Sequence, residues 1–205
     1  MSALDISLTT FIDFAAKSGT RRITCVREAR ALYDQDYHPA RDFWRGLRQA
    51  IIALHQGDGA RADLDALLLR VPSRKSERYE QSIAGYKRFL GRHELSWFEP
   101  PHTRWDSGNL SVRVNPELGL LIDGEPHLVK LYMKQASIAK FEMDAMLYLL
   151  RQSTPPHLDG ATPLVVDVAR GKSFRPTREI SELGALLDGE AAAFVAMWRE
   201  FDAAA

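Results

Sequence analysis

Hydrophobic residues in the first hundred positions recur at helical spacing, and turn residues separate one stretch from the next. In the stretch that starts near Ser76, Tyr79, Ile83 and Tyr86 fall on one seam, as expected of an amphipathic helix. Capping residues, glycines and prolines mark the ends of each stretch. The predicted helices cover residues 8–18, 21–33, about 40–57, 60–70 and 76–91.

The second half of the chain changes to the period of β-strands. Leu110, Val112 and Val114 alternate with polar residues, as a half-buried strand requires. The pair Asp123-Gly124 is typical of a tight hairpin turn, so the strands on either side of it should be antiparallel. The predicted elements are strands over 110–114, 118–123 and 127–133, a helix over 137–152, a strand over 164–168 and a helix over 178–201.

These elements predict an α+β protein. A helical N-terminal half is followed by a small mixed sheet of about four strands packed by helices, in the order αβββαβα. We divide the chain into an N-terminal helical region, 1–72, and an α/β core, 73–205, and expect the two to pack as one unit, because 205 residues are too few for two full-sized domains.

Composition limits the ligands and the cellular compartment that we expect for this protein. The 27 basic and 27 acidic side chains cancel, which argues against binding a polyanion through bulk charge. The single cysteine, Cys25, excludes an intramolecular disulfide, and its apolar neighbours favour a packing role over a reactive thiol. Neither an export signal nor an apolar run long enough for a membrane span is visible. Together with 20 arginines against 7 lysines, this predicts a protein of the bacterial cytoplasm.

The order of elements from residue 76 onward resembles that of the restriction-endonuclease-like fold, the PD-(D/E)XK nucleases. That resemblance implies a metal-binding carboxylate on the second strand, an acid-x-lysine pair on the third, and often a glutamate from the first helix. The matching positions in this chain are Asp123 at the end of the second strand, Lys130 on the third, and Glu80 on the helix. Under this hypothesis Mg²⁺ would be the cofactor; otherwise we expect none.

The third strand departs from the nuclease pattern. Leu128, Lys130 and Tyr132 share one face, so a leucine stands where the family has its central acid. The resemblance therefore implies an inactive or re-purposed relative. Asp123 could instead be only a turn residue, and Glu80 only an exposed helix residue. Lys130 must either reach solvent or contact an anion.

The segment from 70 to 92 is the most basic part of the chain. Its cations would form an exposed stripe opposite the Tyr79 seam, able to neutralise several phosphates, and Trp97 and Trp105 nearby could stack on bases. The alternative is an ordinary solvated helix face in an arginine-rich protein. The candidate nucleic-acid-binding residues are Arg74, Lys75, Arg78, Arg88 and Arg92.

Three hypotheses remain open from the sequence. The first is a non-catalytic protein that binds nucleic acid or a protein partner through the basic helix and the Lys130 face. The second is a metal-dependent nuclease that uses Glu80, Asp123 and Lys130. The third is a plain protein-interaction module. No HExxH, phosphate-loop or G-x-S-x-G motif points to another class of enzyme.

Overall fold

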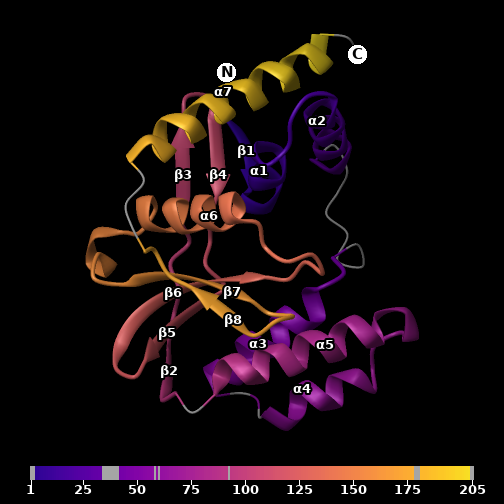
Figure 1. Ribbon diagram of the computed structural model, residues 1–205, viewed down its shortest axis with the longest axis vertical. Helices are drawn as coiled ribbons and strands as arrows, with labels where there is room; N and C mark the ends of the chain where they lie inside the picture. Colours follow the sequence, from indigo (N-terminus) through magenta and orange to yellow (C-terminus); the bar gives the residue numbers. More distant parts are fainter. Residues whose placement is uncertain are drawn as a thin grey trace.

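The computed structural model describes residues 3–33, 42–57, 59, 61–91, 93–177 and 181–203. It confirms the α+β class, with helices packed around two sheets (Figure 1). The helices are α1 (Leu8–Ala15), α2 (Thr20–Tyr33), α3 (Arg45–Gln56), α4 (Arg61–Leu68), α5 (Ser73–Leu90), α6 (Lys140–Gln152), the 3-10 turn η2 (Pro156–Leu158) and α7 (Ser181–Ala203). The strands are β1 (Leu4–Ser7), β2 (Leu95–Phe98), β3 (Arg104–Ser107), β4 (Leu110–Arg113), β5 (Leu118–Ile122), β6 (Glu125–Tyr132), β7 (Thr162–Asp167) and β8 (Lys172–Phe174).

The larger sheet has five strands in the order β2-β5-β6-β7-β8. Strand β5 is antiparallel to both of its neighbours, β7 runs parallel to β6, and β8 is antiparallel to β7. The sheet is mixed, as the sequence predicts, but it has one strand more than expected and begins with β2. The strand predicted over 110–114, placed by the sequence at the start of this sheet, belongs to the other one.

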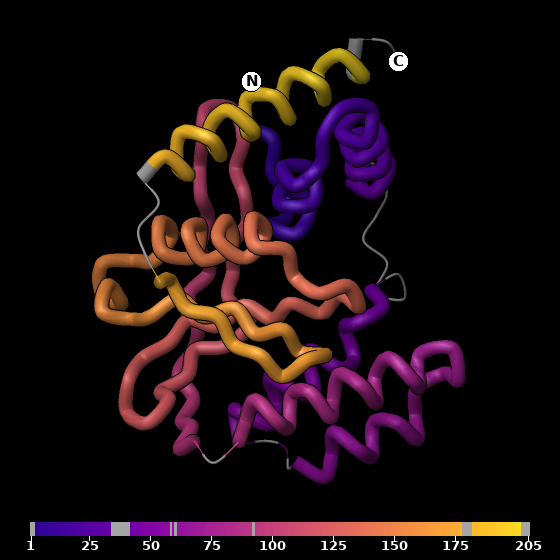
Figure 2. Tube along the Cα trace, in the orientation of Figure 1, coloured from indigo at the N-terminus to yellow at the C-terminus, as the bar shows by residue number. Residues whose placement is uncertain are grey.

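The smaller sheet joins distant parts of the chain in the order β1-β4-β3. Strand β1 pairs in parallel with β4, matching Leu4 with Leu110 and Ser7 with Arg113. The N-terminal segment is therefore not purely helical. Figure 2 shows the indigo N-terminal segment beside the β3–β4 hairpin, and α2 and α7 close together at the same end of the molecule.

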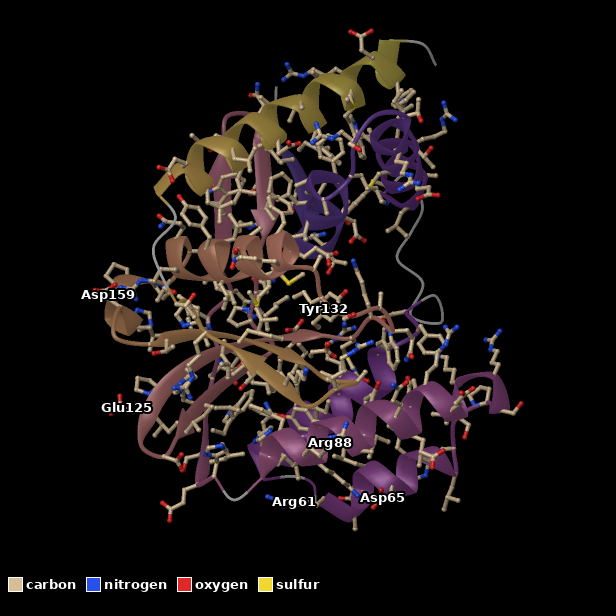
Figure 3. All side chains as sticks on the ribbon, viewed as in Figure 1. Arg61, Asp65, Arg88, Glu125, Tyr132 and Asp159 are labelled. Carbon is tan, nitrogen blue, oxygen red and sulfur yellow. The ribbon has the colours of Figure 1, made fainter. Side chains whose placement is uncertain are left out.

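Two hydrophobic clusters lie on opposite faces of the five-stranded sheet, because alternate residues of a strand point to opposite sides. Val129 and Leu131 of β6, with Met133 just after it, lie with α3, α4 and α5 in one cluster. Tyr132 faces the other way, into a cluster with α6, α1, α2, α7 and the small sheet (Figure 3). The seam Tyr79, Ile83 and Tyr86 is buried in the first cluster, as the periodicity predicts.

Close backbone packing fixes α5 on the sheet. A Cβ atom at Gly85 would lie 2.1 Å from the carbonyl oxygen of Val168, so no side chain fits at this position. The described part of α7 is continuous, and Gly184 and Gly189 do not break it. Among the described helices, none combines the length and the apolar composition that crossing a membrane would need.

Candidate functional site

The β5–β6 hairpin places a carboxylate opposite Lys130. Its turn residues, Asp123 and Gly124, both have positive φ, 52° and 88°, as a two-residue hairpin turn of this kind requires. The turn fixes the register, which matches Leu118 with Val129. Glu117, one residue earlier, therefore lies opposite Lys130 on the same face of the sheet.

Glu117 and Lys130 form a closely bonded ion pair. The Lys130 ammonium donates hydrogen bonds to Glu117 Oε1 and to the carbonyl oxygen of Asn115, both at 2.8 Å. The backbone N–H of Leu131 donates to Glu117 Oε2 at 2.9 Å. The side chains of Lys130 and Glu117 are only 12% and 14% exposed. Both carboxylate oxygens are thus held by the protein itself.

The turn at Asn115, next to this ion pair, has an uncommon backbone conformation. Asn115 has φ 29°, an uncommon value for a residue other than glycine. Its side-chain oxygen accepts a hydrogen bond from the backbone N–H of Thr103 at 2.8 Å, and the N–H of Val114 donates to the Thr103 carbonyl at 3.0 Å. These bonds hold the turn in the conformation that presents the Asn115 carbonyl to Lys130.

Glu117 and Lys130 border a cavity of about 990 Å³, which residues of the N-terminal segment, of α3 and of the strand region line together. Six parts of the fold wall it: the β1–α1 junction, the end of α2, one side of α3 with Asp42 before it, the end of β2 with the segment between β2 and β3, the chain leading from β4 into β5, and β6 through Lys130. Its apolar surface comes from Leu8, Leu32, Ile52, Trp97, Pro100 and Pro116, and its polar surface from Ser7, Thr9, Tyr33, Asp42, Arg48, Gln56, Glu99, His102, Arg113, Asn115, Glu117 and Lys130.

The cations that line the cavity are already paired with carboxylates. Arg48 bonds to Asp42, and Lys130 bonds to Glu117. Arg113 lies 3.4 Å from Asp5 and its guanidinium stands over the Tyr33 ring. The cavity lining is therefore close to electrically neutral, and its positive charges are compensated before any ligand arrives.

The structure does not bring the three candidate catalytic residues together. Lys130 lines the cavity, but Asp123 and Glu80 do not. Asp123 sits in the hairpin turn, roughly 15–20 Å along β6 from Lys130 at the usual rise of a strand. Glu80 is exposed on α5. The carboxylate beside Lys130 is Glu117 instead.

The bonds of Asp123 are those of a turn. Its carboxylate accepts a hydrogen bond from the backbone N–H of Glu94 at 3.0 Å and lies 2.7 Å from Nδ1 of His93. The hydrogen bond with His93, followed by that of the Glu94 N–H, lowers the pKa of Asp123. Its side chain thus ties the hairpin tip to the start of β2.

The residues around Lys130 do not fit a magnesium site. Leu128 is buried at the position where the nuclease pattern has an acid, and both oxygens of Glu117 are occupied by hydrogen bonds. Mg²⁺ needs free carboxylate oxygens in near-octahedral geometry. Throughout the described ranges, no group of three or more histidine, cysteine or acidic side chains could hold a metal ion.

Four of the five candidate nucleic-acid-binding residues lie on α5, and their side chains differ in exposure and in hydrogen bonding. Arg74 and Arg78 are exposed, and within the described residues neither bonds to a carboxylate. Lys75 is half-buried and donates to the carbonyl oxygen of Phe43 at 2.8 Å. Arg88 is exposed and donates to the Ala169 carbonyl at 3.4 Å, at the far end of the helix (Figure 3). Arg92 lies outside the described residues.

The N-terminal end of α5 forms a cationic and aromatic surface against the start of α3. Lys75 and Arg78 stand 4.8 and 5.6 Å from the centre of the Phe43 ring. Phe43 precedes Trp44, whose ring stacks on Tyr79 at 5.5 Å, and follows Asp42 of the cavity wall. We call Arg74, Lys75 and Arg78 the cationic cluster; Lys75 and Arg78 contact Phe43, which is next in sequence to Asp42 of the cavity wall.

Sequence reasoning missed Glu117, although the chain contains the signal that finds it. Once Asp123-Gly124 is taken as a two-residue turn, counting back along both strands pairs residue 117 with residue 130. A lysine in the middle of a strand must either reach solvent or contact an anion, and a glutamate directly opposite supplies that anion. Arg48 and Arg113 carry no such local signal, since α2, α3 and β4 meet at the cavity only through the tertiary fold.

No protein-family model matches the sequence, and no curated protein matches it significantly.

Proposed function

We propose that this protein binds nucleic acid without cleaving it, as a non-catalytic relative of the PD-(D/E)XK nucleases. The observation that carries the proposal is the cationic cluster. Arg74 and Arg78 are exposed and free of carboxylate partners within the described residues, and Arg78, like Lys75, lies over the ring of Phe43, which packs against Trp44. Exposed cations next to aromatic rings are what a nucleic-acid backbone and its bases require.

The arrangement of the larger sheet supports the nuclease relationship. Helix α5 is followed within this sheet by β2, β5 and β6, then by α6 and β7, which is the helix, three strands, helix, strand order of that fold. A carboxylate at the start of the second of these strands, Glu117, meets a lysine on the third, Lys130. These are the two places where the family carries such groups.

The absence of cleavage follows from the same pair. Leu128 supplies no oxygen ligand, and Glu117 uses both of its oxygens on Lys130 and on the N–H of Leu131. A divalent ion would have to break these bonds to find a single carboxylate ligand, which is too little for Mg²⁺. We further propose the bacterial cytoplasm as the setting, where the one buried thiol, Cys25, would stay reduced.

The experiment is a binding titration of labelled DNA and RNA by fluorescence anisotropy at 50 and 200 mM salt. Arg74→Glu with Arg78→Glu should weaken binding at least tenfold at low salt and flatten the salt dependence by about two ions, because each phosphate contact contributes roughly one. The matched control is Arg21→Glu with Arg199→Glu, two exposed arginines on α2 and α7, which should bind like the wild type.

Two outcomes would change the proposal. Unaltered, salt-steep binding by the Arg74 and Arg78 double variant would move the interface elsewhere. Cleavage of any of the probes with Mg²⁺ or Mn²⁺, lost in Glu117→Ala, would show an active nuclease. Without binding at low salt, the protein-interaction module would become the preferred hypothesis.

A further inference from the structure

The cavity beside the cationic cluster differs from the cluster in its chemistry. The cluster offers uncompensated charge on an open surface. Inside the cavity, Arg48, Arg113 and Lys130 are each paired with a carboxylate. A phosphate entering the cavity would have to compete with those carboxylates and would meet Glu99 as well, which lines the wall and is exposed. The cavity is therefore suited to an uncharged group.

The wall offers what a flat heterocycle needs. Trp97, Pro100 and Pro116 supply rings that can lie against an aromatic face. Gln56 and His102 are exposed at the same wall and supply hydrogen-bond donors and acceptors that could meet the edge of a base. A nucleobase has two flat apolar faces and a polar edge, so the rings and the polar side chains of this cavity complement it.

The volume of the cavity bears on whether the bound nucleic acid is single-stranded or a duplex. At about 990 Å³ it has the volume of pockets that enclose one compact organic ligand. A base must leave its stack to enter such a space, which costs little in a single strand and on the order of 100-fold in affinity in an intact duplex.

We infer that the cavity accepts an unpaired nucleobase while the neighbouring phosphates contact the cationic cluster, so that the protein prefers single-stranded nucleic acid to duplex. The inference rests on the proposed function, because the cluster must hold the backbone for a base to reach the cavity. Beyond nucleic-acid binding in general, it names single-stranded nucleic acid as the preferred ligand. The path between the two parts is short, since Phe43, which Lys75 and Arg78 contact, is the neighbour of the cavity residue Asp42.

The test compares a 12-nucleotide single strand with its duplex, each carrying one 2-aminopurine, a base whose fluorescence falls when it stacks. The wild type should bind the single strand about tenfold more tightly, a gain in line with one stacked base. It should quench the 2-aminopurine of the single strand but not that of the duplex.

A variant that fills the cavity separates this inference from general polyanion binding. Gln56 lines the cavity near the end of α3 and is exposed, so Gln56→Trp should obstruct the cavity without touching the core. It should lower single-strand affinity at least fivefold, abolish quenching and leave duplex affinity unchanged. Gln49→Trp, on the same helix but not at the cavity wall, is the control and should behave as the wild type.

The outcomes distinguish the two claims. Equal affinity for single strand and duplex, with Gln56→Trp indistinguishable from wild type, would overturn the base pocket and leave the proposed function standing. Loss of single-strand and duplex binding together in the Arg74 and Arg78 double variant, with the preference present in wild type, is the result that supports both. A protein that binds neither probe at 50 mM salt overturns both.

Discussion

Removing one partner of the Glu117–Lys130 pair should destabilise the protein more than removing both. In Lys130→Met the side chain keeps most of its length but no longer donates to Glu117 or to the Asn115 carbonyl. Loss of one partner from a fully buried pair costs about 3–5 kcal/mol. Since both side chains keep a little exposure, 12% and 14%, we expect a loss of about 2–3 kcal/mol in the free energy of unfolding.

The double variant Lys130→Met with Glu117→Gln removes both charges together. A glutamine at 117 can still accept from the Leu131 N–H and leaves no uncompensated carboxylate, so its stability should return to within about 1 kcal/mol of wild type. Urea denaturation followed by tryptophan fluorescence measures the difference. With an m-value of about 3 kcal/mol/M, the single variant's midpoint should fall by about 0.7–1 M. A single variant within 0.2 M of wild type would refute the reasoning, because the pair would then be solvated.

Two further predictions concern packing and pH. Gly85→Ala should lower the melting temperature by roughly 6–12 °C, about 3 kcal/mol, because its Cβ would lie 2.1 Å from the Val168 carbonyl oxygen. Gly189→Ala, whose Cβ would have no neighbour within 4 Å, should raise the melting temperature slightly. Equal shifts in the two variants would contradict the close packing of α5 on the sheet. Burial, aided by the charge of Arg61, lowers the pKa of His55 to about 4. Protonation of His55 therefore favours the unfolded chain. The free energy of unfolding should fall by about 1–2 kcal/mol, after discounting for solvent, as pH drops from 6.5 to 4. His55→Gln should lose that part of the pH dependence in urea titrations at several pH values, and an unchanged profile would argue against a buried neutral ring.

Elements with long, regular periodicity could be predicted from the sequence. The helix expected over 21–33 is α2, that over 76–91 is α5, and the hairpin around Asp123 is in place. The short strands β1, β2, β3 and β8 were missed because three or four residues carry no resolvable alternation. The pairing of β1 with β4 joins residues about a hundred positions apart, and no local pattern encodes such a contact.

Of the candidate site residues, Lys130 lies at the cavity, where a lysine in the middle of a strand draws attention in the sequence. Asp123 bonds within the hairpin turn, and Glu117, just before the opposite end of β5, meets the lysine. The cavity itself arises where α2, α3 and the two sheets converge, which depends on tertiary packing and not on any single segment.

Nucleic-acid binding through the cationic cluster is best tested by the anisotropy titration of a single-stranded oligonucleotide against the wild type and the Arg74→Glu, Arg78→Glu variant at 50 and 200 mM salt. We expect salt-sensitive binding by the wild type, at least tenfold weaker binding by the variant, and an intact probe after incubation with Mg²⁺. Equal binding by the two proteins, or none by the wild type at 50 mM salt, would contradict this proposal.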